Sequence, residues 1–71
     1  MTMYAILNTK TKKFVYGTDK SNGWPFYQRE SSEQMITYSD PEIAKIDFRR
    51  RGCGDEYKIA KVSINIEQIL P

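Results

Sequence analysis

The chain has 71 residues, of which 39% are hydrophobic and 28% are charged, and its net charge is +2. This length corresponds to one domain over residues 1–71, and the composition is too apolar for a disordered segment and too polar for a membrane protein. One cysteine excludes an internal disulfide, and the lack of histidine removes the commonest general base and the commonest metal ligand.

These features predict a protein that is not an enzyme and that uses no metal and no cofactor. No apolar run approaches the ~20 residues that cross a bilayer, and the opening MTMYAILNTK lacks the charged start and long apolar stretch of a signal peptide. We therefore expect a cytoplasmic protein without membrane contact. The small positive charge leaves open whether its partner is a protein or a nucleic acid.

Residues 3–8 (MYAILN) and 13–18 (KFVYGT) are rich in strand-forming residues, and a short polar stretch separates them. This pattern predicts a β-hairpin. Its tip carries Lys10, Lys12 and Lys13, which could contact a nucleic-acid backbone. A solvated turn kept soluble by lysine is the commoner arrangement, since edge lysines also discourage aggregation.

An irregular segment, residues 19–33 (DKSNGWPFYQRESSE), follows the hairpin. Pro25 and the turn-forming pair Asn22–Gly23 disfavour a helix or a central strand, and loops of this length are often functional. Aromatic residues together with arginine dominate the hot spots of protein interfaces. The predicted partner-binding residues are Trp24, Phe26, Tyr27 and Arg29.

The same aromatic side chains have two other uses. Aromatics with basic neighbours can stack on unpaired bases. Alternatively, the loop folds back and supplies apolar mass to a small core. The second use favours a buried Trp24, with Tyr27 and Arg29 still facing outward.

Residues 34–38 (QMITY) predict a short third strand, and the following SDPEIAKIDFRRRG predicts a helix over residues 41–51. Either Ser39 or Asp40 suits the N-cap, and Pro41 suits the first helical position. The apolar side chains of this helix fall on one broad arc that should face the sheet. They are Ile43, Ala44, Ile46 and Phe48.

Three arginines, residues 49–51, end the predicted helix, and Gly52 fits the left-handed residue that closes it. Successive helical residues are turned by ~100°, so the arginines cannot form one flat stripe. Asp47 has ion-pair spacing to Arg50 and Arg51, and cations suit the last turn. We interpret the run as a helix end, in which Arg50 or Arg51 could still hold a carboxylate or phosphate.

Cys53 lies between two glycines and has no histidine to activate it. It is interpreted as a reduced, non-catalytic thiol, or as the site of an intermolecular disulfide in an oxidised sample. Residues 57–67 (YKIAKVSINIE) predict the last strand, with Tyr57 and Ile59 out of phase with the apolar face, as at a bulge or a position covered on both faces. That face would contain Ala60, Val62, Ile64 and Ile66.

The expected fold is α+β, with a small antiparallel-rich sheet of about four strands packed on one helix in the order ββ-loop-β-α-β. Strand order stays open. An exposed sheet edge and the apolar terminal residues 69–71 would also suit a homodimer. The predicted core comprises Tyr4 or Ala5, Ile6, Phe14 or Val15, Ile36, Ile43, Ala44, Phe48, Val62, Ile64 and Ile66.

The segments MYAILNTKTKKFVYGTD and RRGCGDEYKI are similar to short uncharacterised proteins of phages and prophages of Gram-positive bacteria. The resemblance covers most of the chain and implies a compact, cytoplasmic accessory protein that binds a host or phage macromolecule. It supplies no site residues. We therefore predict a non-enzymatic protein-binding module that acts as an inhibitor or regulator. The alternative is a small nucleic-acid-binding protein that uses Lys10, Lys12, Lys13, Arg50 and Arg51.

Overall fold

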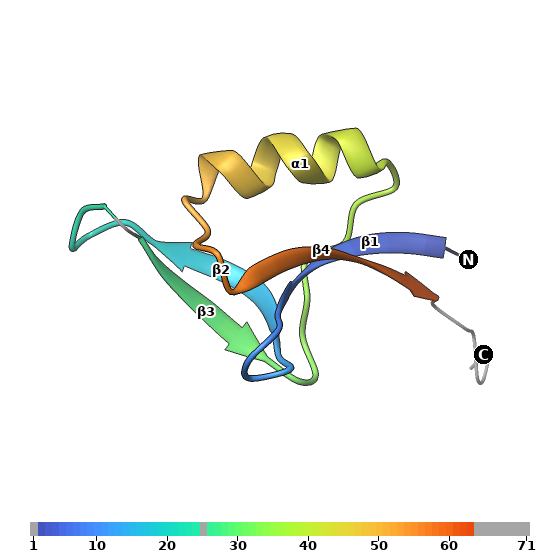
Figure 1. Cartoon of the computed structure of the whole chain (residues 1–71), viewed down its shortest axis with the longest axis horizontal. Helices are drawn as coiled ribbons and strands as arrows, with labels where there is room; N and C mark the ends of the chain where they lie inside the picture. Colours follow the sequence, from blue (N-terminus) through green and yellow to red (C-terminus); the bar gives the residue numbers. More distant parts are fainter. Residues whose placement is uncertain (1, 25, 64–71) are drawn as a thin grey trace, which may run out of the picture.

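A computed structural model describes residues 2–24 and 26–63 of the chain. In chain order its elements are β1 (Thr2–Asn8), β2 (Phe14–Asp19), β3 (Tyr27–Ser31), α1 (Pro41–Arg50) and β4 (Tyr57–Ser63). The strands form one antiparallel sheet in the order β3-β2-β1-β4, and α1 lies across β1 and β4 (Figure 1). This arrangement confirms the predicted α+β fold. No helix of the described residues is long and apolar enough to cross a membrane.

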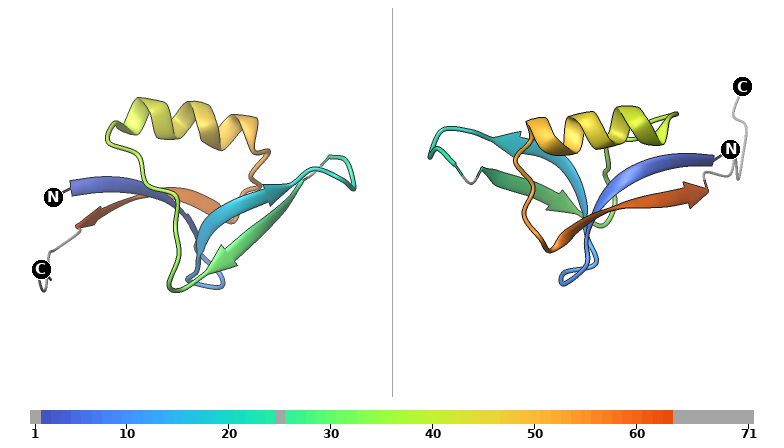
Figure 2. Two further views of the ribbon diagram at one scale, coloured as in Figure 1. Left: turned by 180° about the vertical axis from the view of Figure 1, so that it is seen from behind. Right: turned by 45° about the horizontal axis from the view of Figure 1, so that its top comes forward.

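The sheet opens into two ribbons. β1 pairs with β4 along its whole length, and β2 pairs with β3 through an irregularity between Val15 and Gly17. β1 and β2 pair only where Leu7 lies opposite Phe14. The two ribbons therefore diverge from the β1–β2 turn, as both views in Figure 2 show.

The segment of residues 32–40 runs through the opening between the ribbons on its way to α1 (Figure 2). The Ile36 N–H donates to the Val15 carbonyl at 3.1 Å, and Tyr38 exchanges two backbone hydrogen bonds of 2.8 Å with Tyr4. These hydrogen bonds satisfy backbone groups on the facing edges of β1 and β2, where the two strands do not pair with each other.

The prediction of a third strand at residues 34–38 is wrong, because in this segment only Tyr38 forms a β-bridge. The third strand is β3, which lies inside the segment predicted to be irregular. It buries the polar Gln28 and exposes Tyr27 and Arg29. This inverts the usual alternation of apolar residues inward and polar residues outward, so the sequence pattern does not reveal the strand.

The predicted helix ends are confirmed. The Asp40 side chain accepts a hydrogen bond of 2.8 Å from the Glu42 N–H, and Pro41 occupies the first turn. At the other end Arg51 is the C-cap, and Gly52 has the left-handed φ of 61°. Capping side chain, proline and glycine thus act together to fix the length of α1.

The predicted inward arc of α1 is only half right. Ala44 is buried and Phe48 packs on the core, but Ile43 and Ile46 are 53% and 57% exposed. Asp47 and Arg51 take the inward positions instead. Asp47 bonds to Tyr38 and Arg51 bonds to Thr18, beneath the helix. The sheet-facing side of α1 and its C-cap carries Ala44, Asp47, Phe48 and Arg51.

The core lies between α1 and the sheet. Its buried apolar cluster consists of Ile6, Val15, Tyr38, Ala44 and Tyr57. Partly buried side chains that pack against this cluster are Tyr4, Ile36, Phe48, Cys53 and Ile59. Ala5 is also fully buried, whereas Phe14 is half-buried.

The predicted inward face of the last strand is reversed. Tyr57 and Ile59 point toward the core, and Ala60 and Val62, with side chains in the other phase of β4, are half-buried. Ile6 lies directly opposite Ile59, so strand pairing places both on the helix side. Ile64, Ile66 and residues 69–71 lie outside the described residues.

Candidate functional site

The candidate site is built on the connection between β2 and β3. The Asp19 carboxylate accepts a hydrogen bond of 2.9 Å from the Ser21 N–H, which starts the turn. The Gly23 N–H donates to the Lys20 carbonyl at 3.2 Å, and Gly23 adopts a φ of 74°, which favours glycine. This turn directs the following residue, Trp24, back toward the end of α1.

Trp24 and Phe26 pack edge to face, with ring centroids 5.3 Å apart and ring planes at 76°. Both rings lie against Gly52, where a Cβ atom would overlap the Trp24 ring and come within 3.0 Å of Phe26. The Lys20 ammonium lies 5.3 Å from the centroid of the Phe26 ring. Trp24 nevertheless remains 70% exposed, so it is not a core residue.

Tyr27 and Arg29 lie on the other side of β3. Tyr27 is 67% exposed, and within the described residues the one ion pair of Arg29 is a long contact of 3.9 Å with Asp19. Alternation along the strand turns these two side chains away from Gln28, whose amide bonds beneath the helix end. The structure thus divides the four predicted residues into a Trp24–Phe26 pair at the helix end and a Tyr27–Arg29 pair facing outward.

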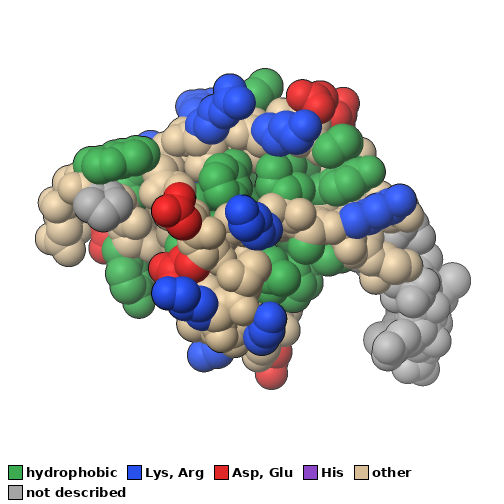
Figure 3. All heavy atoms as spheres, viewed as in Figure 1, with side chains coloured by type: hydrophobic (Ala, Val, Ile, Leu, Met, Phe, Trp, Pro, Cys, Tyr) green, Lys and Arg blue, Asp and Glu red, His purple; other side chains and the backbone are tan. Residues whose placement is uncertain are grey.

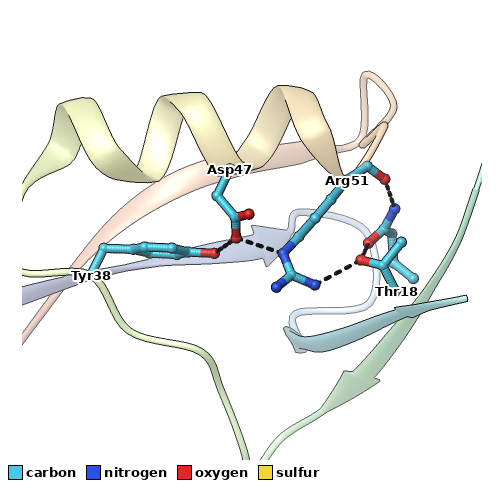
Figure 4. A network of polar contacts seen from close by, with 5 residues as sticks. Thr18, Tyr38, Asp47 and Arg51 are labelled. Atoms are coloured by element: carbon cyan, nitrogen blue, oxygen red, sulfur yellow. Dashed lines mark hydrogen bonds and ion pairs between the residues drawn. The ribbon is translucent and has the colours of Figure 1, made fainter.

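A polar network joins the end of α1 to β2 and β3 (Figure 4). The Tyr38 hydroxyl donates to the Asp47 carboxylate, and Arg51 Nε donates to the same oxygen at 2.6 Å. Arg51 Nη1 donates to Thr18 Oγ1 at 2.9 Å, and the Gln28 amide donates to the Arg51 carbonyl at 2.5 Å. Arg51 is therefore committed to holding the fold together. The sequence indicated only its pairing with Asp47.

The five basic residues proposed for nucleic-acid binding do not form one patch. Lys10, Lys12 and Lys13 lie at the β1–β2 turn, where β2 begins, whereas Arg51 bonds to Thr18 near the end of β2. Thr18 is five residues beyond Lys13 (18 − 13), a span of roughly 17 Å along a strand. Arg50 instead lines a polar hollow of about 260 Å³ at the network.

A second polar cluster surrounds Glu30. Its carboxylate accepts hydrogen bonds from Thr11 at 2.6 Å, from Tyr57 at 2.5 Å and from Asn8 at 3.0 Å. These contacts join the β1–β2 turn to both ribbons of the sheet. Because the acceptor positions of Glu30 are occupied by structural donors, we assign this carboxylate a role in the fold.

Both networks lower the pKa of their carboxylates. Burial alone would raise the pKa of Glu30, but the hydrogen bonds from Thr11, Tyr57 and Asn8 outweigh it. For Asp47 the same effect of burial is outweighed by the bonds from Tyr38 and Arg51. Burial and the Asp47 contact in turn raise the pKa of Tyr38 to about 12.

The lowered carboxyl pKa values predict loss of stability in acid. A carboxyl group with a lower pKa in the folded chain stabilises the fold fully above its unfolded pKa, and that contribution disappears as the pH falls through the folded pKa. Thermal unfolding should therefore occur at a nearly constant Tm around pH 6 to 8 and at a falling Tm below about pH 4.5. The double variant Glu30→Gln, Asp47→Asn should show a clearly flatter pH profile; an unchanged slope would contradict this assignment.

Cys53 lies half-buried beside the end of α1. Burial raises the pKa of its thiol to about 11, an effect that nearby Arg51 opposes and Asp47 reinforces. Little thiolate is then present at neutral pH, and the thiolate is the reactive form. These surroundings favour the reduced, non-catalytic thiol predicted from the sequence.

Among residues 2–24 and 26–63, no cluster of three or more Cys, Asp or Glu side chains is arranged to hold a metal ion. Comparison with protein-family models, curated proteins and solved structures found no match to this chain.

Proposed function

We propose that this protein is a non-enzymatic protein-binding module. Its partner packs against the connection of residues 20–26 between β2 and β3, here called the aromatic loop, and Trp24 is at the centre of the contact. The observation that carries the proposal is that Trp24 is both held and exposed. Its ring rests on Gly52 and Phe26, yet 70% of the residue faces solvent. A fixed aromatic side chain loses little conformational entropy when a partner covers it.

The surroundings of Trp24 fit a protein partner. Tryptophan, tyrosine and arginine are the residues most enriched at interface hot spots. Tyr27 and Arg29 form a second exposed pair on the outer side of β3, separate from the Trp24–Phe26 pair. The finer proposal, which draws on the phage resemblance, is an inhibitor or regulator of a host protein. The nucleic-acid alternative is less favoured, because its basic residues lie at two separated places.

Affinity capture tests the proposal. The tagged chain should retain a protein from a lysate of a Gram-positive bacterium after nuclease treatment. Trp24→Ala should weaken binding of that protein by about tenfold or more, the range of an interface hot spot. Ile46→Ala is the matched control, because it also truncates an exposed apolar side chain, and it should bind as the native chain does.

Two outcomes would contradict the proposal. Binding that disappears on nuclease treatment, or that falls steeply with salt, would indicate phosphate contacts and thus nucleic acid. Equal loss of binding in Trp24→Ala and Ile46→Ala would show that the aromatic loop is not the contact surface.

A further inference from the structure

A second surface, separate from the aromatic loop, lies between α1 and β4. Here a cleft of about 320 Å³ is lined by six side chains. Three of them, Phe48, Tyr57 and Ile59, come from the core cluster or pack against it. The cationic side chains are Lys45, Arg49 and Lys58. In Figure 3 hydrophobic side chains form a row between α1 and β4, with Lys and Arg side chains on both sides of it.

The cleft borders an open strand edge. β4 ends the sheet order, and in the described part of the chain it pairs only with β1. An unpaired edge presents N–H and C=O groups that can bond to an added strand. The cleft thus offers apolar contacts next to a row of backbone donors and acceptors.

The hydrogen bonds of β1 determine which groups of β4 point outward. The Tyr4 N–H donates to the Tyr38 carbonyl, and the Tyr4 carbonyl accepts from the Tyr38 N–H, on the side of β1 away from β4. In an antiparallel pair, the residue opposite such a position also directs its backbone groups away from the pair. That residue is Lys61. By the same alternation, Ile59 and Ser63 also present their backbone groups at the free edge.

The charge of the cleft selects the partner. Three cationic side chains and no acidic side chain line it. In the part of the chain that the structure describes, Lys45 pairs only with the exposed Glu42, at 3.2 Å, and both side chains are largely solvated. A second copy of this chain would bring the same cationic side chains to the shared edge, and like charges across paired strands are unfavourable. A strand with acidic side chains is complementary.

We propose that the β4 edge and the α1–β4 cleft bind an extended acidic peptide segment of another protein, which adds to the sheet as a fifth strand. Backbone bonds to Ile59 and Lys61 supply the pairing, and apolar side chains of the peptide pack on Phe48 and Ile59. The carboxylates of the peptide form ion pairs with Lys45, Arg49 and Lys58. This is β-strand addition, in which main-chain bonds give affinity and side-chain contacts give specificity.

A labelled peptide tests the proposal directly. The probe is a fluorescein-tagged octapeptide with the repeat Val-Val-Glu-Glu, which places valine and glutamate on both faces of the added strand, and binding is followed by fluorescence anisotropy. Its affinity should be at least about tenfold higher than that of the same peptide with lysine in place of glutamate. Methylating the amide nitrogens of alternate residues that face β4 should remove binding. Equal binding of the lysine peptide or of the methylated peptide would overturn the proposal.

Variants locate the site on the protein. Lys61→Pro removes an outward N–H that edge strands can spare, and it should reduce affinity by about tenfold or more, whereas Lys61→Ala retains the N–H and should have a smaller effect. Arg49→Glu should weaken binding, and Trp24→Ala should leave it unchanged. Circular dichroism confirms that each variant is folded, and the peptide series keeps the test decisive where a variant is not.

Other occupants of the edge would give distinct results. A chain that light scattering shows to be a dimer, and that Lys61→Pro makes monomeric, would indicate a second copy at this edge and overturn the proposal. Displacement of the peptide by an oligodeoxynucleotide, with the same dependence on Arg49, would overturn it in favour of nucleic acid.

Discussion

Replacing Asp47 with alanine should lower the free energy of unfolding by about 2–3 kcal/mol. One oxygen of Asp47 accepts both from Arg51 Nε at 2.6 Å and from the Tyr38 hydroxyl. Without it, the Arg51 guanidinium and the buried Tyr38 lose their shared acceptor. The Arg51 and Asp47 side chains are only 22% and 25% exposed, so water replaces the lost bonds poorly. Urea unfolding followed by circular dichroism measures the change.

Glu42→Ala is the matched control for this prediction. Glu42 also forms an ion pair on α1, with Lys45, but the two side chains are 73% and 56% exposed. Exposed pairs of this kind contribute about 0–1 kcal/mol. Comparable destabilisation by Glu42→Ala and Asp47→Ala would show that the buried network adds nothing beyond an ordinary surface pair.

A change of this size is large for the whole domain. A folded chain is stabilised by about 0.05–0.15 kcal/mol per residue. This chain has 71 residues and a single cysteine, so no internal disulfide adds to its stability. α1 meets the sheet through few apolar side chains, since Ile43 and Ile46 face solvent. The Asp47 network therefore replaces part of the apolar packing that usually holds a helix on a sheet.

The sequence predicted the parts of the fold that depend on local chemistry. Asp40, Pro41 and Gly52 determine where α1 begins and ends, because capping acts within a few residues. The β1–β2 hairpin also follows from neighbouring residues. The sequence did not predict which side chains face inward, because the residues beneath a helix or strand come from distant segments.

β3 shows why pattern alone fails. Its inward residue, Gln28, is acceptable only because the Arg51 carbonyl and Thr18 are there to bond with it. Those partners are 23 and 10 residues away in sequence. No periodicity within YQRES reveals them, so the sequence pattern predicts a loop here.

The candidate site was predicted by composition and not by geometry. Its four residues are together in the sequence, but strand alternation separates Phe26 from Tyr27 and Arg29. The α1–β4 cleft gave no sequence signal, because Phe48 and Ile59 resemble ordinary core residues and their basic neighbours resemble ordinary surface residues. Only the open edge of β4 makes them a surface.

Replacing Gly52 with alanine should lower the free energy of unfolding by about 2 kcal/mol and release Trp24 from the end of α1. Part of the effect is backbone strain, since a φ of 61° is unfavourable for a residue with a Cβ. The rest is steric, because the new methyl group meets the Trp24 and Phe26 rings. Gly54→Ala is the matched control. Apart from its two chain neighbours, no described residue has an atom within 4 Å of a Cβ there, and the change should be nearly neutral. Tryptophan fluorescence should shift toward the solvent-exposed value in Gly52→Ala alone.

A double variant separates the two causes. With Trp24 already changed to alanine, Gly52→Ala should be less destabilising, because backbone strain and the Phe26 contact remain while the Trp24 clash is gone. Equal destabilisation in both backgrounds would mean that the indole does not rest on Gly52.

The contact between Gly52 and the indole should also affect partner binding. If the glycine holds the indole in its binding position, Gly52→Ala should weaken partner capture while Trp24 itself is still present, because the partner then meets a mobile side chain and must order it.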